Sequence, residues 1–343
     1  MEIKQIIFTA ANVAELLDVT IDEPKDDEVM VKLEYTTISA GTERANLVGD
    51  LNVNGGAPCT DTVAHFPRTL GYSGAGVVYK VGKDVKSFKV GDRVAAFNGK
   101  HASFWNYKEH MLVKIPSDDI SFSEASMAYI STFPIAAVRK MKPELGESAI
   151  VMGLGILGIF SVQFLKAAGI YPVIAVDPVK EKRDFALTMG ADYALDPTEE
   201  SFVSTVKELT DGGAHIAIEV TGLGKGFDQA LDCMRKMGRV ALLGCTRNSD
   251  FTIDYYRKIH FPGITVVGAH TCARPEGESF PNYWTHIDDI KTGFKLIMGN
   301  RVNYKKMVSE IHSPIEASEV FTRLATEKTF PSGVQFDWSR LDK

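Results

Sequence analysis

A glycine pattern near the middle of the chain could bind the pyrophosphate of a dinucleotide. It follows the apolar run at 148–152 and opens a helical stretch. In such a motif the first glycine forms a turn, the second lets the backbone approach the pyrophosphate, and the third lets helix and strand pack closely. Free amides at the helix N-terminus then bind phosphate. The residues expected to form this site are Gly153, Gly155, Ile156, Leu157 and Gly158.

Asp177 ends the next apolar run, VIAVD, 24 residues after Gly153. A carboxylate at this point accepts hydrogen bonds from ribose hydroxyls and repels a 2′-phosphate, which favours NAD over NADP. Lys182 and Arg183 follow closely and could weaken that preference. Two other interpretations remain: the glycines serve packing alone, or the nucleotide is FAD, whose motif usually lies near the start of a chain.

Alternating strands and helices position this motif. We expect strands at 148–152, 173–176, 214–219 and 239–243, and helices at 156–168, 180–189 and 227–237. Such alternation builds a parallel, doubly wound sheet. After the apolar run at 263–268 the chain returns to the first domain, where we expect two helices and a closing strand.

Residues 1 to about 120 have a different pattern. Strands at 28–35 and 76–81, and a third after the turn at Gly91, are separated by glycines and predict a small barrel or sandwich. Ser121, with Glu124 three residues later, marks a helix start. The expected domains are therefore 1–121 with 270–343, and a dinucleotide-binding domain at 122–269.

Composition narrows the function classes. The chain has 343 residues, a net charge of −6 and 45% hydrophobic residues, which is typical of a globular protein. Because nucleic-acid binding needs a basic surface, we expect no nucleic-acid partner. No apolar run reaches the ~20 residues that cross a bilayer, and no signal peptide is evident. The scattered cysteines favour a reducing cytoplasm.

Several blocks resemble the medium-chain dehydrogenase/reductase superfamily, the zinc alcohol and polyol dehydrogenase group. GYSGAGVVYKVG at 71–82 is similar to that family's GHE-x2-G-x5-G-x2-V block, and ISAGTE at 38–43 resembles its Cys-Gly-Thr-Asp block. ISAGTE also resembles the branch that includes bacteriochlorophyllide dehydrogenases. The resemblance implies an α/β fold, with a GroES-like β-barrel domain and a doubly wound Rossmann domain.

The chain departs from that family at its zinc ligands. Ala40 replaces the Cys, Tyr72 replaces the His, and Tyr129 and Phe133 stand near the third ligand. Zinc needs nitrogen, sulfur or oxygen donors, and an alanine side chain has none. The segment 96–110 also lacks the family's structural cysteines. We therefore predict no zinc, although His65, His101 and His110 leave an unrelated metal site conceivable.

Without zinc, other groups must handle the proton of the substrate hydroxyl. Thr42 matches the family's relay hydroxyl, and Tyr72 could donate to a carbonyl oxygen as general acid. Glu43 could orient Thr42 or act as base, and His65 or His101 could be a general base. Each has a plain alternative: a loop threonine, an aromatic filling an empty hole, a carboxylate paired with Arg44, or a structural histidine.

The resemblance also implies further cofactor contacts. They are expected at Lys182, Thr221, Cys245, Ala269 and His270. Polar and aromatic residues at Arg274 and 283–286 suit a polar substrate. The family commonly pairs through the edge of the dinucleotide sheet, so ITVVGAH predicts a homodimer or homotetramer.

The sequence thus predicts a zinc-independent, NAD-dependent oxidoreductase acting on a secondary alcohol or ketone, such as a sugar, cyclitol or polyol. One alternative is an NADPH-dependent quinone or enone reductase of the same superfamily. Another is a nucleotide-binding protein without turnover.

Overall fold

The computed structural model describes residues 1–53, 62–247, 249 and 251–341. These residues form two compact units. Unit 1 comprises Met1–Ile130 and Tyr304–Lys343, and unit 2 comprises Ser131–Asn303. Cys59, one of the scattered cysteines, lies outside the described residues.

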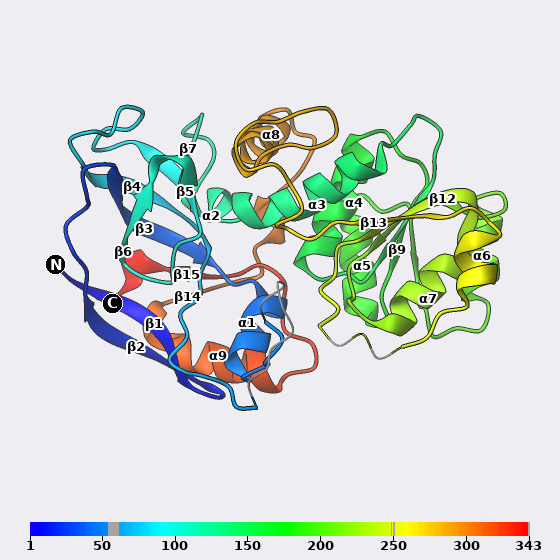
Figure 1. Ribbon diagram of the computed structural model, residues 1–343, viewed down its shortest axis with the longest axis horizontal. Coiled ribbons are helices and arrows are strands. Elements are labelled where there is room, and N and C mark those ends of the chain that lie inside the picture. Colours follow the sequence, from blue (N-terminus) through cyan, green and yellow to red (C-terminus); the bar gives the residue numbers. More distant parts are fainter. Residues whose placement is uncertain (54–61, 248, 250, 342–343) are drawn as a thin grey trace. The chain divides into compact units, whose positions relative to one another are not determined.

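Unit 1 is built on a mixed, mostly antiparallel sheet, in which β14 and β15 pair in parallel, and on an N-terminal hairpin (Figure 1). The sheet has the order β14-β15-β3-β4-β5-β7, with β6 pairing with β3, while β1 and β2 form the hairpin. Its strands are β1 (Glu2–Ala10), β2 (Val13–Thr20), β3 (Glu28–Thr37), β4 (Ser73–Val81), β5 (Arg93–Phe97), β6 (Phe104–Lys108), β7 (Leu112–Lys114), β14 (Glu310–His312) and β15 (Val334–Asp337). Its helices are α1 (Ala40–Leu47), α2 (Phe122–Ala125) and α9 (Ala317–Thr326).

The glycines of β4 allow two strands to approach unusually closely. A Cβ on Gly76 would lie 2.0 Å from the carbonyl oxygen of Lys32 in β3, a distance that no side chain tolerates. Gly71, just before the strand, has a φ of +109°, and a Cβ there would lie 2.1 Å from the amide nitrogen of His101. The dense glycines of 71–76 therefore serve close backbone contact within unit 1.

Unit 2 is a parallel sheet with the strand order β10-β9-β8-β11-β12-β13. From β8 the next two strands are added on one side of the sheet, and β11, β12 and β13 are then added on the other side. This change of side between β8 and β11 is typical of dinucleotide-binding folds. Its strands are β8 (Ala149–Met152), β9 (Val173–Val176), β10 (Tyr193–Leu195), β11 (Ala214–Glu219), β12 (Met234–Leu242) and β13 (Thr265–Gly268). Its helices are α4 (Ile156–Ala167), α5 (Lys180–Thr188), α6 (Phe202–Leu209), α7 (Gly224–Asp232) and α8 (His286–Met298). Helix α3 (Ala128–Met141) crosses the boundary between the units.

The predicted α/β fold, with a GroES-like first domain and a Rossmann domain, is confirmed. The strands predicted at 173–176 and 214–219 have the predicted bounds. The helix predicted at 227–237 is wrong at both ends, because α7 begins at Gly224 and ends at Asp232. Met234 already belongs to β12, which pairs with β11 and β13. Sheet pairing thus overrides the local helical pattern, as tertiary context often does.

The chain returns from unit 2 to unit 1 at residue 304, which is later in the sequence than the predicted residue 270. Residues 270–303 belong to unit 2, and 122–130 belong to unit 1. Buried ion pairs hold the former segment within unit 2, since Asp289 of α8 bonds to Arg139 of α3 at 2.8 Å. The capping box predicted at Ser121 is present: Ser121 Oγ accepts from the Glu124 amide, and Glu124 Oε2 accepts from the Ser121 amide.

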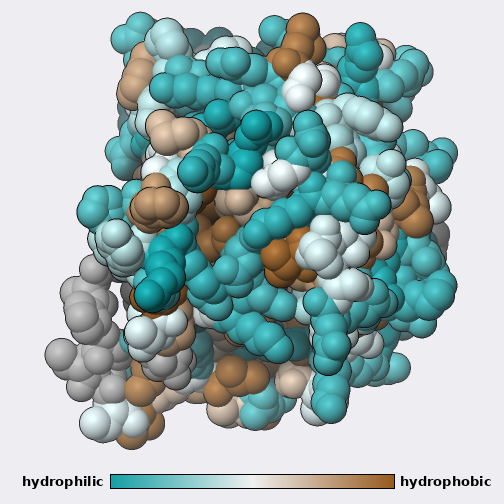
Figure 2. All heavy atoms as spheres, turned by 90° about the vertical axis from the view of Figure 1, so that its right-hand side faces the viewer, coloured by the Kyte–Doolittle hydropathy of each residue, from teal (hydrophilic) through white to brown (hydrophobic). Residues whose placement is uncertain are grey.

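Polar residues dominate the face seen in Figure 2, where hydrophobic residues occur in small separate groups. Exposed large hydrophobic side chains of unit 2 include Met237, Tyr256, Phe261 and Val266. Val266 lies in β13, which is an edge strand of the sheet. Among the described residues, no helix combines the length and apolar character that crossing a membrane requires.

Candidate functional site

The glycine loop after β8 has the geometry that its sequence predicts. Gly153 has a φ of +94°, which only glycine adopts without strain. A Cβ on Gly158 would lie 1.9 Å from the Gly153 carbonyl oxygen, so only a glycine here lets helix α4 pack this closely against the loop that follows β8. A Cβ on Gly155 would meet nothing within 4 Å. Gly155 is the N-cap of α4, and because glycine has no side chain, the first amides of the helix are not capped by it.

Asp177 is tied to this loop. Its side chain is only 6% exposed, and Oδ2 accepts from the Leu154 amide at 2.9 Å. Oδ1 accepts from the Val179 amide, also at 2.9 Å. Each carboxylate oxygen has a second lone pair, so the acid can still accept a hydrogen bond from a hydroxyl group. Arg183 donates to the Asp177 carbonyl at 2.7 Å and pairs with the carboxylate of Asp196 at 2.9 Å.

A second buried acid shapes the loop after β11. Glu219 accepts from the Thr221 amide at 2.7 Å, from the Thr221 hydroxyl, and from the Gly222 amide at 3.2 Å. Burial raises the pKa of Glu219 above its ordinary value. The Thr221 hydroxyl also accepts from the Leu223 amide, so this side chain stabilises the turn through two hydrogen bonds. A Cβ on Gly222 would lie 2.7 Å from the carbonyl oxygen of the exposed Cys245, which brings these two loops together.

The loop after β13 is held by a buried lysine. Lys140 donates to the carbonyls of Gly268 at 2.9 Å and Ala273 at 2.6 Å. Ala269 is buried, and its amide donates to the Leu242 carbonyl. His270 is exposed, and its Nδ1 accepts from the Cys272 amide. All the predicted cofactor residues lie on or just beyond the carboxyl ends of the strands or in α4 and α5, and their contacts with a cofactor stay predictions.

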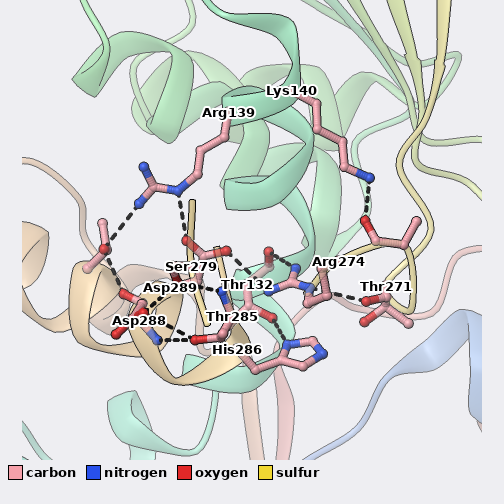
Figure 3. A network of polar contacts seen from close by, with 12 residues as sticks. Thr132, Arg139, Lys140, Thr271, Arg274, Ser279, Thr285, His286, Asp288 and Asp289 are labelled. Atoms are coloured by element: carbon pink, nitrogen blue, oxygen red, sulfur yellow. Dashed lines mark hydrogen bonds and ion pairs between the residues drawn. The ribbon is translucent and has the colours of Figure 1, made fainter. Parts of the chain in front are cut away.

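Arg274 does not present a free charge to a substrate. Its side chain is 4% exposed, and its guanidinium donates to Asp289 at 3.1 Å, to the Thr132 carbonyl at 2.7 Å and to the Thr271 carbonyl at 3.1 Å. Figure 3 shows this network together with Arg139, which reaches the other oxygen of Asp289. These contacts give Arg274 a structural role within unit 2, and its suggested contact with a polar substrate stays a prediction. Two guanidiniums compensate one fully buried carboxylate here.

In unit 1, Tyr72 lies in a cluster of hydroxyls and aromatic rings. Its hydroxyl bonds to Ser39 Oγ and interacts with Thr42. Its ring meets the Tyr129 ring edge-on at 5.5 Å, and Tyr129 stacks on Phe97 at 5.0 Å. Burial raises the pKa of Tyr72 above its ordinary value, so the phenol stays protonated at neutral pH.

Glu43 and His101 form a buried pair beside this cluster. Glu43 is 0% exposed and His101 is 1% exposed, and Glu43 Oε2 lies 3.0 Å from His101 Nε2. The pairing of Glu43 with Arg44 that the sequence left open is wrong, because Arg44 donates to the carbonyls of Leu324 and Glu327. His65 is exposed and its carbonyl accepts from Arg68. The structure thus groups Thr42, Tyr72, Glu43 and His101, and a role of His65 as a general base stays a prediction.

The donor set in this cluster does not fit zinc. Ala40 begins α1 and offers only a methyl group, while Tyr72 and Tyr129 offer neutral phenols. Across the described residues, His, Cys, Asp and Glu side chains nowhere gather in a group of three or more that could hold a metal ion. His101, one of the three histidines considered for an unrelated metal, is committed to Glu43 and Thr36.

Comparisons with known proteins match both units. The alcohol dehydrogenase GroES-like domain matches residues 25–117, and the zinc-binding dehydrogenase family matches residues 157–289. L-threonine 3-dehydrogenase of Pyrococcus furiosus is 29% identical over 74% of this chain and 79% of its own length. D-guloside 3-dehydrogenase of Escherichia coli is 26% identical over 97% of this chain and 100% of its own length.

Solved structures agree on the fold. The 2R,3R-butanediol dehydrogenase of Bacillus subtilis superposes with a TM-score of 0.79 at 22% identity, covering 98% of this chain and 99% of that chain. An Escherichia coli oxidoreductase of unknown specificity gives a TM-score of 0.82 at 19% identity, with the same coverage. The chain belongs to the medium-chain dehydrogenase/reductase superfamily.

Sequence reasoning missed Ser39, which the structure places in contact with Tyr72. A signal was present, since a serine before a helical stretch is a typical N-cap. Thr36, which bonds to His101, carried no signal because its partner lies 65 residues away.

His286 supplies a prediction about acid stability. Its Nδ1 lies 3.0 Å from the Thr132 hydroxyl, and burial, with a smaller effect of Arg274, lowers the pKa of His286 to about 3. The unfolded chain takes up this proton near pH 6.5, so this contribution to stability is complete above pH 6.5 and declines as the pH falls. We expect a loss of ~1.4 kcal/mol of unfolding free energy per pH unit below that value from this group.

Urea unfolding of the protein and of His286→Gln at pH 7, 6 and 5 checks this. The difference in unfolding free energy between the two should shrink as the pH falls, because the variant lacks the titrating ring. Parallel pH dependences would show that His286 titrates alike in the folded and unfolded states.

Proposed function

We propose that this protein is a zinc-independent, NAD(H)-dependent oxidoreductase that interconverts a secondary alcohol and a ketone of a sugar, cyclitol or polyol. The observation that carries the proposal is the replacement of metal ligands by hydroxyls and aromatic rings around Tyr72. The 26% sequence identity with D-guloside 3-dehydrogenase, over 97% of this chain, supports a sugar-like substrate.

The nucleotide fits unit 2. The open space at Gly155 and the uncapped N-terminus of α4 suit a pyrophosphate, with Ile156 and Leu157 offering amides. Asp177 would accept from the adenosine ribose hydroxyls, and Ala269 and His270 would lie on the nicotinamide side. When bound, the nicotinamide carries the hydride that is exchanged with the substrate carbon.

Tyr72 would take over the role that a metal has in relatives. Burial keeps the phenol protonated, and its one hydrogen is donated to Ser39 Oγ. With a substrate bound, the phenol would turn this hydrogen to the carbonyl oxygen and pass the proton as the alcohol forms. The Thr42 hydroxyl would donate a second hydrogen bond to the same substrate oxygen. In this proposal Glu43 and His101 do not exchange protons with the substrate, because both side chains are buried in contact with each other.

The central experiment measures turnover and metal content together. Protein dialysed against a chelator is assayed with NAD against methyl D-guloside, myo-inositol, 2,3-butanediol and L-threonine. We expect turnover of at least one of these with far less than one zinc per chain. Activity that needs stoichiometric zinc would falsify the ligand argument.

The same assay separates the alternatives. NADPH binding much more tightly than NADH, with turnover of quinones or enones, would favour the reductase alternative. Tight NADH binding without turnover of any alcohol or ketone would favour a nucleotide-binding protein.

A second prediction concerns the choice of cofactor. Asp177→Ser removes the charge that opposes a 2′-phosphate, so the preference for NADH over NADPH should fall by roughly tenfold or more, the worth of one charge-assisted hydrogen bond. Fluorescence titration with both nucleotides measures the ratio. Lys180→Ser is a matched control, because Lys180 pairs with Asp184 on the surface of α5. An unchanged ratio in Asp177→Ser would mean that the acid does not contact the ribose.

We also propose that two copies pair through β13. This edge strand has an exposed backbone row and an exposed Val266, which are typical of a strand that pairs with another chain. Light scattering should give a dimer or tetramer, and Val266→Lys should shift it toward the monomer, because an edge lysine opposes strand pairing. A monomeric parent protein would contradict the proposal.

A further inference from the structure

Helix α1 begins at a serine that does not cap it. Ser39 is the N-cap residue, yet its side chain accepts no hydrogen bond from the helix amides. Ser121 and Ser313, by contrast, both cap their helices with the hydroxyl in full capping boxes. The Ser39 hydroxyl oxygen instead accepts a hydrogen bond from the Tyr72 hydroxyl. A group that normally stabilises a helix end is therefore directed at the residue proposed to act on the substrate.

Glu43 makes this possible. Its Oε1 accepts from the Ser39 amide at 2.9 Å, and the Glu43 amide donates to the Ser39 carbonyl at 2.9 Å. The start of α1 is thus closed by the Glu43 side chain and main chain, which leaves the Ser39 hydroxyl free for Tyr72. The other carboxylate oxygen meets His101 Nε2 at 3.0 Å.

The protons behind Glu43 can be assigned because each donor needs an acceptor. Trp338 Nε1 donates to Thr36 Oγ1 at 2.9 Å, and that hydroxyl lies 2.8 Å from His101 Nδ1. If Thr36 donates to Nδ1, the Nε2–H of His101 donates a hydrogen bond to Glu43 Oε2. In this arrangement each of these polar hydrogens is used, which is the rule for buried groups.

His101 also holds the segment that carries Tyr72. Its amide donates to the Leu70 carbonyl at 2.7 Å, and Gly71 passes against its backbone. The Asn98 amide donates to the Tyr72 carbonyl at 2.9 Å. The loop 98–101 therefore contacts both the backbone of Tyr72 and, through Glu43, the backbone of Ser39.

We propose that Ser39 is a positioning residue for Tyr72, and that the buried Glu43–His101 pair fixes Ser39 in the orientation that this requires. The inference rests on the proposed function of Tyr72. By accepting from the phenol, Ser39 holds the Tyr72 ring in one orientation, so that only the phenol hydrogen has to turn toward a substrate oxygen. The gain is one of preorganisation, in which supporting hydrogen bonds lock the acting side chain.

A double-mutant cycle on catalysis tests the proposal, with NAD and the best substrate of the four-compound panel. Tyr72→Phe should lower kcat by about 100-fold or more, as loss of a general acid does. Ser39→Ala should lower kcat by roughly 10- to 100-fold, while the KM for NAD and the affinity for NADH stay within about twofold. In the Tyr72→Phe background, Ser39→Ala should have less than about a threefold effect, because it acts through the phenol.

Two further variants sharpen this result. Ser73→Ala removes a neighbouring hydroxyl that is also buried and donates to the Ser126 carbonyl, and its kcat should match the parent protein. Glu43→Gln keeps the volume but weakens the acceptor for Ser39 and His101, so it should lower kcat in the parent and not in Tyr72→Phe. Equal effects of Ser39→Ala in both backgrounds, or none in either, would overturn the proposal. A parent-like kcat in Glu43→Gln would overturn the part assigned to the buried pair.

An unfolding cycle keeps this test separate from that of the proposed function. A parent-like kcat in Tyr72→Phe, or no turnover of any panel compound, refutes the function and not the contact. Urea unfolding of Ser39→Ala, Tyr72→Phe and the double variant then measures their coupling. Together the two changes should raise the unfolding equilibrium constant by about fivefold less than the product of the single effects, the worth of one hydrogen bond. Independent effects would show that Ser39 does not hold Tyr72.

Discussion

The buried carboxylate of Glu43 is the constraint on which the arrangement of unit 1 around Tyr72 depends. An ionised group at 0% exposure is costly unless it is paired and hydrogen-bonded. Glu43 meets this requirement with the Ser39 amide and the His101 ring, which lies 58 residues away in the chain. One charge therefore joins the start of α1 to a loop between strands. That junction also determines where the Ser39 hydroxyl points, and through it the position of Tyr72.

The same principle organises the carboxyl edge of the sheet in unit 2. Asp177 closes the glycine loop onto the end of β9, Glu219 closes the turn after β11, and Asp289 holds two arginines between α3 and α8. Loops at this edge of a parallel sheet are where ligands bind, yet loops have few contacts of their own. Buried acids that accept from backbone amides or guanidiniums give these loops defined conformations.

Local patterns allowed much of this to be predicted. Gly153 and Gly158 have the conformation and the close contact that their spacing indicates, and the strands of unit 2 alternate with helices as expected. Long-range pairing defeated the prediction elsewhere. Helix α7 ends at Asp232 because Met234 already belongs to β12. Arg274 forms an ion pair with the buried Asp289. Neither partner could be identified from neighbouring residues.

The sequence by itself determined the two-domain α/β architecture, the dinucleotide motif and the loss of the metal-ligand types at Ala40 and Tyr72. These depend on residue identity and on short spacings, which physical rules interpret directly. Only the tertiary structure decided that Glu43 pairs with His101 rather than Arg44, and that Ser39 turns its hydroxyl to Tyr72. The reason is that a buried polar group bonds to whichever partner the fold brings within about 3 Å, and sequence distance does not limit that choice.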